Sequence, residues 1–332
     1  MEELLAGLKA VAETTRIRIL FALSHGELNV TELTFILQQS QPRVSRHLKL
    51  MAEAGLISRH KEGNWVLFRL RDGGRSGALA RSLVDMLPAS DGFLAGDLTR
   101  LDDIRQQRQD KAAAYFSTNA ADWAKLRSLH VNEAEVEQAM LALLGPQHFK
   151  NCVDLGTGTG RILELLHGRT DHVFGLDMSR DMLAIARANL EKNNQRNAQV
   201  RQANIYELPL ADGFADLVTI HQVLHFLDDP QRALTEAARI MCPGGKLLVV
   251  DFAPHDFDEL RDQHAHRRLG IASEHMSVWL ARAGLQLLRH DVLPPPWINA
   301  RMGLTVSLWF AERALIATPR NVPHLILGKK QA

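Results

Sequence analysis

The sequence predicts an α/β protein in which a small helical unit with a hairpin precedes a doubly wound, mainly parallel sheet. Three observations carry this prediction. The 332 residues suffice for two domains with separate hydrophobic cores. Amphipathic helical stretches and one hairpin pattern fill the first 72 residues. From residue 151 onward, short apolar runs alternate with helical ones, an order typical of a parallel sheet with helices on both faces.

Composition narrows the class of protein. A formal net charge of +1 and 46% hydrophobic residues indicate a globular chain and give no whole-chain argument for nucleic acid. Cys152 and Cys242 fall in apolar stretches without metal-site spacing, which fits a reducing cytoplasm and excludes a disulfide framework. The first residues are acidic and periodic rather than continuously apolar, so neither a signal peptide nor a membrane span is expected. We expect a cytoplasmic chain with no membrane partner and no bound metal.

The N-terminal unit is predicted to contain two helices that are joined by a short turn. Thr31 is expected to cap the first helix and Ser40 the second, with Pro42 in the first turn, where a missing N–H costs nothing. Two strand patterns follow, at residues 56–59 and 65–70, and their proximity predicts a hairpin.

The second helix, residues 41–54, has two distinct faces. Val44, Leu48 and Met51 point to one side, whereas polar and basic side chains crowd the other. Between residues 40 and 61, Glu53 is the one acidic residue among five basic ones, and such a local excess suits a phosphate backbone. The alternative is a solvated basic face on an ordinary helical domain. The candidate DNA-binding residues are Gln41, Arg43, Ser45, Arg46, His47, Lys49, Arg59 and Lys61.

The segment SQPRVSRHLKLMAEAGLISRHKEGNWVLFRL, residues 40–70, closely resembles the winged helix-turn-helix of ArsR-type bacterial repressors. The resemblance covers about residues 1–72. It implies an α+β winged helix-turn-helix that binds double-stranded operator DNA, with the recognition helix at residues 41–54 and the wing at 57–70. Metal-sensing members carry cysteines in the segment that aligns with residues 27–33, and this chain has none there. A soft metal is therefore not expected as the signal.

Residues 73–111 are expected to form a dimerisation helix and a linker. In the resembled repressors, the first helix and a helix after the wing build the dimer, so the resemblance implies a homodimer, with Leu4, Leu8 and Leu83 as candidate contacts. Packing of these residues within the monomer is the alternative. A charged helix is expected over residues 94–114.

The stretch NCVDLGTGTGRILEL, residues 151–165, predicts a strand, a glycine-rich turn and a helix. Glycine at alternate positions lets the backbone approach a ligand at the start of the helix. The dinucleotide fingerprint needs its third glycine one residue later, where Arg161 stands, so NAD is disfavoured. Asp154 places an acidic group at the end of the strand, where a sulfonium or ammonium group is attracted and a pyrophosphate is repelled.

Two later positions suit an adenosine ligand. Asp177 ends a short apolar strand about twenty residues after the glycine turn, where a carboxylate can accept both ribose hydroxyls. Asn204 ends the next strand pattern, and its side-chain carbonyl can accept a bond from an adenine amino group. Tyr115 and Trp123 are candidates to close over the site, although core packing is the commoner role of such aromatic residues.

These motifs resemble class I S-adenosylmethionine (SAM) methyltransferases over about residues 112–311. The resemblance implies a Rossmann-like, seven-stranded sheet with SAM or its product S-adenosylhomocysteine (SAH) as the cofactor. We have no account of residues 312–332 beyond a possible strand at 324–327. The candidate cofactor-binding residues are Asp154, Gly156, Thr157, Gly158, Gly160, Asp177, Met178, Asn204, Ile205 and His221.

Catalysis is a separate question, because methyl transfer needs mainly an aligned acceptor. His221 and His225 are the candidate catalytic residues, since histidine acts as a base near neutral pH. A hydrogen-bonded structural histidine is the competing interpretation for each. Arsenite methylation normally relies on several acceptor-side cysteines, and methylation of DNA bases uses an Asn/Asp-Pro-Pro-Tyr type of motif that is absent here. Neither reaction is favoured.

The two resemblances lead to one main hypothesis. We expect a dimeric transcriptional regulator, in which a methyltransferase-like domain binds SAM or SAH and couples occupancy to the affinity for DNA. The arrangement resembles ArsR-type regulators joined to SAM-binding domains, some of which respond to SAH. The alternative is an active C- or O-methyltransferase of small molecules with an autoregulatory DNA-binding domain.

Overall fold

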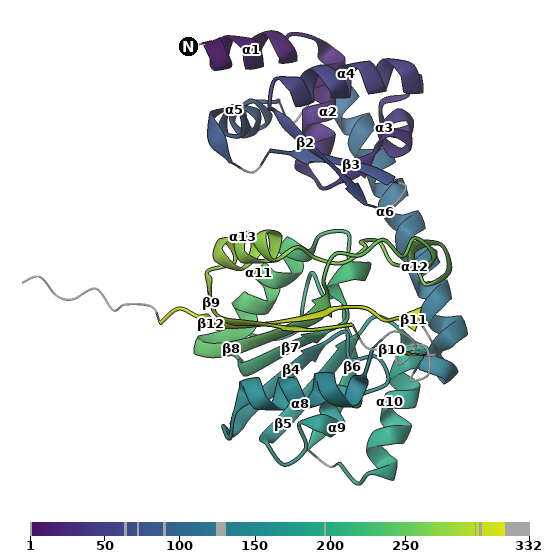
Figure 1. Ribbon diagram of the computed structural model, residues 1–332, viewed down its shortest axis with the longest axis vertical. Coiled ribbons are helices and arrows are strands. Elements are labelled where there is room, and N and C mark those ends of the chain that lie inside the picture. The colour runs from purple at the N-terminus through teal and green to yellow at the C-terminus, as the bar shows by residue number, and fades with distance from the viewer. Residues whose placement is uncertain are drawn as a thin grey trace, which may run out of the picture.

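Two bodies, joined by one long helix, make up the protein (Figure 1). The computed structural model describes residues 2–62, 65–71, 73–88, 91–123, 131–195, 197–295, 297–298 and 301–315. The turn of the wing at residues 63–64 and residues 316–332, which include the possible strand at 324–327, lie outside the described residues. No helix in the described ranges is both long and apolar enough to cross a membrane.

The N-terminal body is a winged helix-turn-helix. Its three strands form an antiparallel sheet in the order β1-β3-β2, and its helices bury a shared apolar core that includes Ile19, Leu33 and Leu48. The elements in chain order are α1 (Glu2–Val11), α2 (Thr14–Ser24), β1 (Leu28–Asn29), α3 (Val30–Leu37), α4 (Gln41–Glu53), β2 (Ile57–Glu62), β3 (Trp65–Leu70) and α5 (Gly74–Asp85).

The caps of the helix-turn-helix differ in part from the expectation. Asn29, and not Thr31, caps α3: the Asn29 side chain accepts a bond from Glu32 N at 3.0 Å, and Glu32 Oε2 accepts one from Asn29 N at 2.9 Å. This reciprocal capping box satisfies two amides, which a threonine two residues later cannot reach. Ser40 occupies the N-cap position of α4 without a capping bond from its side chain, and Pro42 lies in the first turn.

Helix α6 (Gly92–Asn119) connects the two bodies (Figure 1). Asp91 caps it by accepting bonds from Phe93 N and Leu94 N at 2.9 and 3.0 Å. The sequence predicted a helix over residues 94–114, and the helix is longer at both ends. Residue 111, where we expected the linker to end and a separate domain to begin, therefore lies inside one continuous helix.

The C-terminal body contains a seven-stranded sheet with the order β6-β5-β4-β7-β8-β12-β9. The first five strands in this order are parallel, and β12 runs antiparallel to both of its neighbours. The prediction of a doubly wound, mainly parallel sheet is confirmed. The strands are β4 (Phe149–Leu155), β5 (Thr170–Asp177), β6 (Ala198–Gln202), β7 (Ala215–His221), β8 (Met241–Phe252), β9 (Leu285–Leu293) and β12 (Val306–Arg313), and a separate hairpin pairs β10 (Trp297–Ile298) with β11 (Arg301–Met302).

Helices cover both faces of this sheet, as alternating side chains of each strand require. Val153 and Leu155 of β4 belong to one core with α11 and α13, whereas Cys152, the residue before Val153, belongs to the other core with α8, α9 and α10. Both faces are therefore apolar, as is typical of parallel strands. The helices are η1 (Ala120–Asp122), α8 (Glu133–Leu144), α9 (Arg161–Leu165), α10 (Arg180–Lys192), η2 (Leu224–Phe226), α11 (Pro230–Ile240), α12 (Glu259–Gln263) and α13 (Ser273–Arg282).

Candidate functional site

The glycine turn between β4 and α9 lies at the carboxyl end of the sheet. Gly156, Gly158 and Gly160 have φ of 73°, 52° and 86°, a region that favours glycine. A Cβ on Gly156 would lie 2.4 Å from a methyl carbon of Val223. The turn therefore depends on glycine both for its backbone conformation and for the close approach of the segment after β7.

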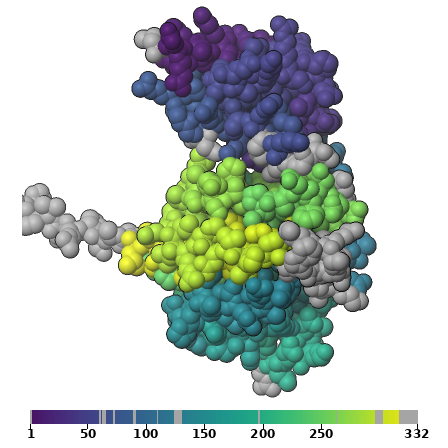
Figure 2. All heavy atoms as spheres, in the orientation of Figure 1, coloured from purple at the N-terminus to yellow at the C-terminus, as the bar shows by residue number. Residues whose placement is uncertain are grey.

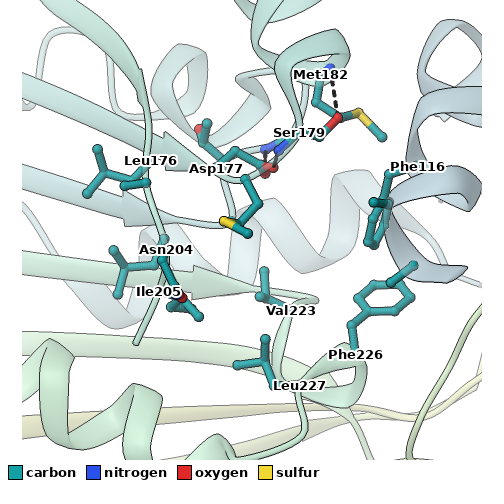
Figure 3. Close-up of a pocket in the computed structure, with 18 of the residues that line it drawn as sticks. Phe116, Leu176, Asp177, Ser179, Met182, Asn204, Ile205, Val223, Phe226 and Leu227 are labelled. Carbon is teal, nitrogen blue, oxygen red and sulfur yellow. Dashed lines mark hydrogen bonds between the residues drawn. The ribbon is translucent and has the colours of Figure 1, made fainter. Parts of the chain in front are cut away.

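Asp177, the last residue of β5, holds this turn in place. Its carboxylate accepts bonds from Gly158 N at 2.9 Å and Ser179 N at 2.8 Å. Burial raises the pKa of this carboxyl, although these backbone bonds oppose the shift. Figure 3 shows Asp177 and Ser179 beside the cavity, with the Ser179 side chain capping α10 through Met182 N at 3.3 Å.

The segment after the neighbouring strand β6 contains the residue expected to meet adenine. Asn204 Oδ1 accepts a bond from Tyr206 N at 3.0 Å, so the side-chain carbonyl already holds the turn that follows β6. A carbonyl oxygen has two lone pairs and can accept a second bond. Ile205 and Val223 present apolar side chains on this side of the cavity (Figure 3).

Asp154 lies deeper than the sequence suggested. It is 1% exposed, and its Oδ1 accepts a bond from Thr219 Oγ of the neighbouring strand at 2.7 Å. It still contributes to the cavity wall.

A cavity of about 420 Å³ opens between these walls, within the size range of small-molecule sites. The structure brings nine of the ten candidate cofactor-binding residues to its lining. Gly160 is the exception, because it turns away to begin α9, where its Cβ position lies 3.2 Å from Ala186 Cβ. The nine are Asp154, Gly156, Thr157, Gly158, Asp177, Met178, Asn204, Ile205 and His221.

One wall of the cavity was not foreseen from the sequence. Arg108, Ala112 and Phe116 of α6 line it, one helical turn apart, and Phe226 faces Phe116 with ring centroids 4.9 Å apart (Figure 3). Trp123 reaches the cavity as expected. Arg108, Ala112 and Phe116 are spaced four residues apart in a stretch rich in alanine, and this spacing could have predicted from the sequence that they share one face of the helix.

Tyr115 does not lie at the cavity, contrary to the expectation. Its hydroxyl lies 2.8 Å from His264 Nδ1, and the neighbouring ring of Phe116 takes the place at the ligand wall. Successive residues of a helix project about 100° apart, so the Tyr115 ring points toward His264 while the Phe116 ring faces the cavity. Burial raises the pKa of the Tyr115 hydroxyl.

The two candidate catalytic histidines differ in position. His221, at the end of β7, lines the cavity, whereas His225 does not. The η2 turn directs His225 inward, where its Nδ1 lies 2.7 Å from Asp251 Oδ1 and both side chains are almost completely buried. A carboxylate in this position fixes the orientation of the imidazole. Asp251, on β8, was missed by sequence analysis.

The candidate DNA-binding face lies on α4 and the wing. Gln41, Arg43, Ser45, Arg46, Lys49, Arg59 and Lys61 are exposed. His47 is half-buried, with its Nδ1 3.9 Å from Glu13 Oε2, and burial lowers the pKa of its imidazole. Val44, Leu48 and Met51 are buried in the core, so the helix presents its polar face outward.

The fold and these two sites define a DNA-binding region joined to a methyltransferase domain. Comparison with protein families agrees with this division. Residues 13–59 match the arsR family of bacterial regulatory proteins, and residues 153–249 match a methyltransferase domain. The cavity and the family match together support SAM or SAH as the ligand of this domain.

Curated relatives resemble only part of the chain. The ubiquinone/menaquinone biosynthesis C-methyltransferase UbiE of Vibrio vulnificus is 34% identical over 120 residues, which cover 35% of this chain and 46% of that protein. The arsenite methyltransferase of Halobacterium salinarum is 33% identical over 102 residues, which cover 30% and 26%. The chain thus spans less than half the length of these relatives.

Solved structures support the fold alone. A chain from the complex between the Haloferax volcanii Trm112 methyltransferase activator and a methyltransferase superposes with a TM-score of 0.50 at 21% identity. The match covers 60% of this chain and 97% of that chain.

Proposed function

We propose that this protein is a cytoplasmic DNA-binding transcriptional regulator, acting as a repressor, that senses SAM or SAH through its methyltransferase-like domain. The winged helix-turn-helix of residues 1–72 contacts operator DNA. Residues 73–111 contribute to a dimer and to the connection, and residues 112–311 hold the ligand. The bound ligand changes the spacing of the two recognition helices in the dimer.

The observation that carries this proposal is the double role of α6. Leu94, Leu101 and Ile104 are buried, and the latter two belong to the core of the winged helix-turn-helix. Further along the same helix, Arg108 and Phe116 line the ligand cavity. A ligand that contacts this wall therefore acts on an element that is built into the DNA-binding body, so it can differ in affinity for two orientations of that body.

The homodimer is part of the same proposal. Leu4, Leu5 and Leu8 of α1 are 48%, 47% and 41% exposed, which places three large apolar side chains together on one short helix. Leu83 of α5, the third expected contact, is half-buried against the core. Apolar side chains gathered in this way suit a protein interface.

Operator binding with and without ligand tests the proposal. A duplex selected by the purified full-length protein from a random library would be titrated by fluorescence anisotropy without ligand, with SAM and with SAH. We expect one ligand to change the operator affinity by at least fivefold, and the operator to change the affinity for that ligand by the same factor.

Two variants serve as controls. Asp177→Asn should remove the effect of the ligand while leaving operator binding intact, and Arg46→Ala should weaken operator binding and reduce its salt dependence by about one counterion. Operator affinities that are identical under the three conditions would contradict the sensing proposal.

Methyl transfer is the second candidate function, favoured by the position of His221 and by the methyltransferase activities of the relatives named above. The acceptor would be a small molecule that reaches the wall of His221 and Phe226. Cys152 is fully buried in β4, where burial raises the pKa of its thiol, and neither cysteine lines the cavity. Arsenite methylation is therefore not favoured. Transfer of a labelled methyl group from SAM to any fraction of a cell extract, lost in His221→Ala, would establish enzymatic activity.

A further inference from the structure

Seven charged side chains from both bodies gather where the bodies meet, and we name them the junction cluster. Figures 1 and 2 show the two bodies one above the other, and Figure 1 shows α6 running from one to the other. The cluster consists of Glu27, Glu32, Arg69, Arg108, Asp228, Arg267 and Arg268.

Arg108 of α6 lies at the centre of this cluster. Its Nη1 donates to Asp228 Oδ1 at 2.8 Å, and its Nη2 donates to Glu32 Oε1. These three side chains are between 15% and 19% exposed, so water screens the contacts only partly. One guanidinium thus joins a carboxylate of the methyltransferase domain to a carboxylate of the winged helix-turn-helix.

Two members of the cluster also line the ligand cavity. Arg108 and Asp228 both contribute to its wall, and Asp228 follows directly on the segment of Val223 and Phe226 that lines the same cavity. Arg268 fixes this segment by donating to the carbonyls of Leu227 and Asp228, each at 3.2 Å. A ligand that shifts this wall therefore shifts one end of the Arg108 bridge.

The other end of the bridge reaches the first turn of α3, the helix that precedes the recognition helix. Glu32 uses Oε1 for Arg108 and Oε2 for the capping box of α3. Helix α3 packs against the recognition helix α4. A change in the contact between Glu32 and Arg108 thus affects the first turn of α3, which packs against α4.

The charges in the cluster are not balanced. Four guanidinium groups meet three carboxylates, and burial lowers the pKa of Arg267 to about 10, with Arg108 and Arg268 acting in the same direction. Arg267 stays charged at neutral pH, with its Nε 2.6 Å from Asp228 Oδ1. Two guanidinium groups therefore share one oxygen of Asp228, and movement of either changes the contact of the other.

We infer that Arg108 is a positioning residue that couples occupancy of the cavity to the placement of the helix-turn-helix through Asp228 and Glu32. This inference rests on the proposed sensing function. The competing interpretation is that the junction cluster only holds the two bodies together. The two differ in one measurable quantity, the factor by which operator DNA changes the affinity for the ligand.

The experiment measures this coupling factor in four full-length proteins by calorimetry with SAM and with SAH, free and bound to the selected operator. The proteins are the wild type, Arg108→Met, Glu32→Gln and the control Arg239→Met. Glutamine can keep the capping box while it removes the charge that faces Arg108. Arg239 binds Glu236, Asp212 and two carbonyls, and these partners all lie in the methyltransferase domain.

We expect Arg108→Met and Glu32→Gln to reduce the coupling factor to within twofold of one, while the control keeps the wild-type factor. A wild-type factor in Arg108→Met, or an equal loss in Arg239→Met, would overturn the inference and leave the sensing function standing. Absence of coupling in the wild type would instead refute the sensing function. Arg108→Lys gives a further check, because one ammonium group cannot reproduce both contacts of the planar guanidinium and should give intermediate coupling.

Discussion

The two halves of α6 are held by different kinds of contact. In the first half, Leu94, Leu101 and Ile104 are buried, and Asp97 is 1% exposed within a network of ion pairs. In the second half, no described side chain from Arg105 to Asn119 is buried. The contacts there are partly exposed: Arg108 bridges Glu32 and Asp228, the Phe116 ring packs against Phe226, and Ser117 Oγ donates to Asp181 Oδ2 at 2.6 Å. The first half is thus packed into the core of the DNA-binding body, whereas the second half forms a wall of the cavity.

Loss of Asp97 should remove the buried ion pairs that hold the first half of α6. Of the changes considered, it should have the largest effect on stability. Asp97 accepts two bonds from Arg18 at 2.6 Å and one from Arg100 at 2.7 Å, and Arg18 is itself buried. Because Asp97→Ala leaves this guanidinium buried without its counterion, we expect a loss of about 3–5 kcal/mol in the free energy of unfolding. Urea denaturation followed by circular dichroism measures it.

Asp102 offers a matched control on the same helix. Its side chain is 60% exposed and pairs with Arg105 at 3.2 Å, so Asp102→Ala should change stability very little. Similar losses in the two variants would show that the first half of α6 is not anchored by its buried charges.

Gly156→Ala should damage the cavity and leave both halves of α6 folded. The new methyl group needs a positive φ and overlaps Val223, so we expect SAH to bind about 10- to 100-fold more weakly, since strain and overlap cost about 1.5–3 kcal/mol. Gly168→Ala is the control, because Gly168 has φ of 80° with no neighbour within 4 Å of its Cβ position. Calorimetry with SAH should show near wild-type affinity for Gly168→Ala, and equal losses in both variants would contradict this reasoning.

Acidification should weaken ligand binding through Asp177. In the proposed complex the ribose hydroxyls donate to the ionised carboxylate of Asp177. Burial raises the pKa of this carboxyl, so ligand binding should weaken at a higher pH than it would with an exposed aspartate. Below that pKa the affinity should fall by about tenfold per pH unit. A raised pKa also means that protonation of Asp177 stabilises the folded protein without ligand, so titration of this group weakens binding without itself unfolding the protein. Asp177→Asn should bind weakly at every pH, and a wild-type slope in this variant would exclude Asp177 as the cause.

Ser117→Ala should have the smallest effect on stability. It tests how firmly the second half of α6 is held. The lost bond to Asp181 is solvent-exposed, and alanine is the better helix former, so stability should stay within about 0.5 kcal/mol of the wild type. Hydrogen exchange should nevertheless become faster for the amides between Arg108 and Asn119, and not for those near Leu101. A loss that matches that of Asp97→Ala would remove the distinction between the two halves.

The sequence was sufficient for features that depend on local pattern. The glycine turn, the acid at Asp177 and the apolar alternation of the strands each obey a short-range rule, and the structure brings nine of the ten candidate cofactor-binding residues to one cavity. These residues come from consecutive strands whose carboxyl ends must meet at one edge of a parallel sheet. The recognition helix likewise follows from its own two faces.

Features that depend on contact between distant segments were not accessible. Arg108 and Asp228 are separated by 120 positions, and no pattern in either segment indicates their pairing. The choice of Phe116 over Tyr115 at the cavity depends on the rotation of α6, which is set by its packing against the other body. The cap at Asn29 was missed for a local reason. Asparagine and threonine are both common at the N-cap of a helix, and the choice between them depends on which side chain can accept a bond from the amide of Glu32.

The length of α6 gives it a mechanical consequence. A straight helix of 28 residues spans about 42 Å, so a tilt of only about 5° at one end displaces the other by about 4 Å. Successive base pairs of DNA are about 3.4 Å apart, and two recognition helices on one operator must keep a separation of about 34 Å. A tilt of α6 by about 5° would therefore displace the DNA-binding body by about the distance between two base pairs.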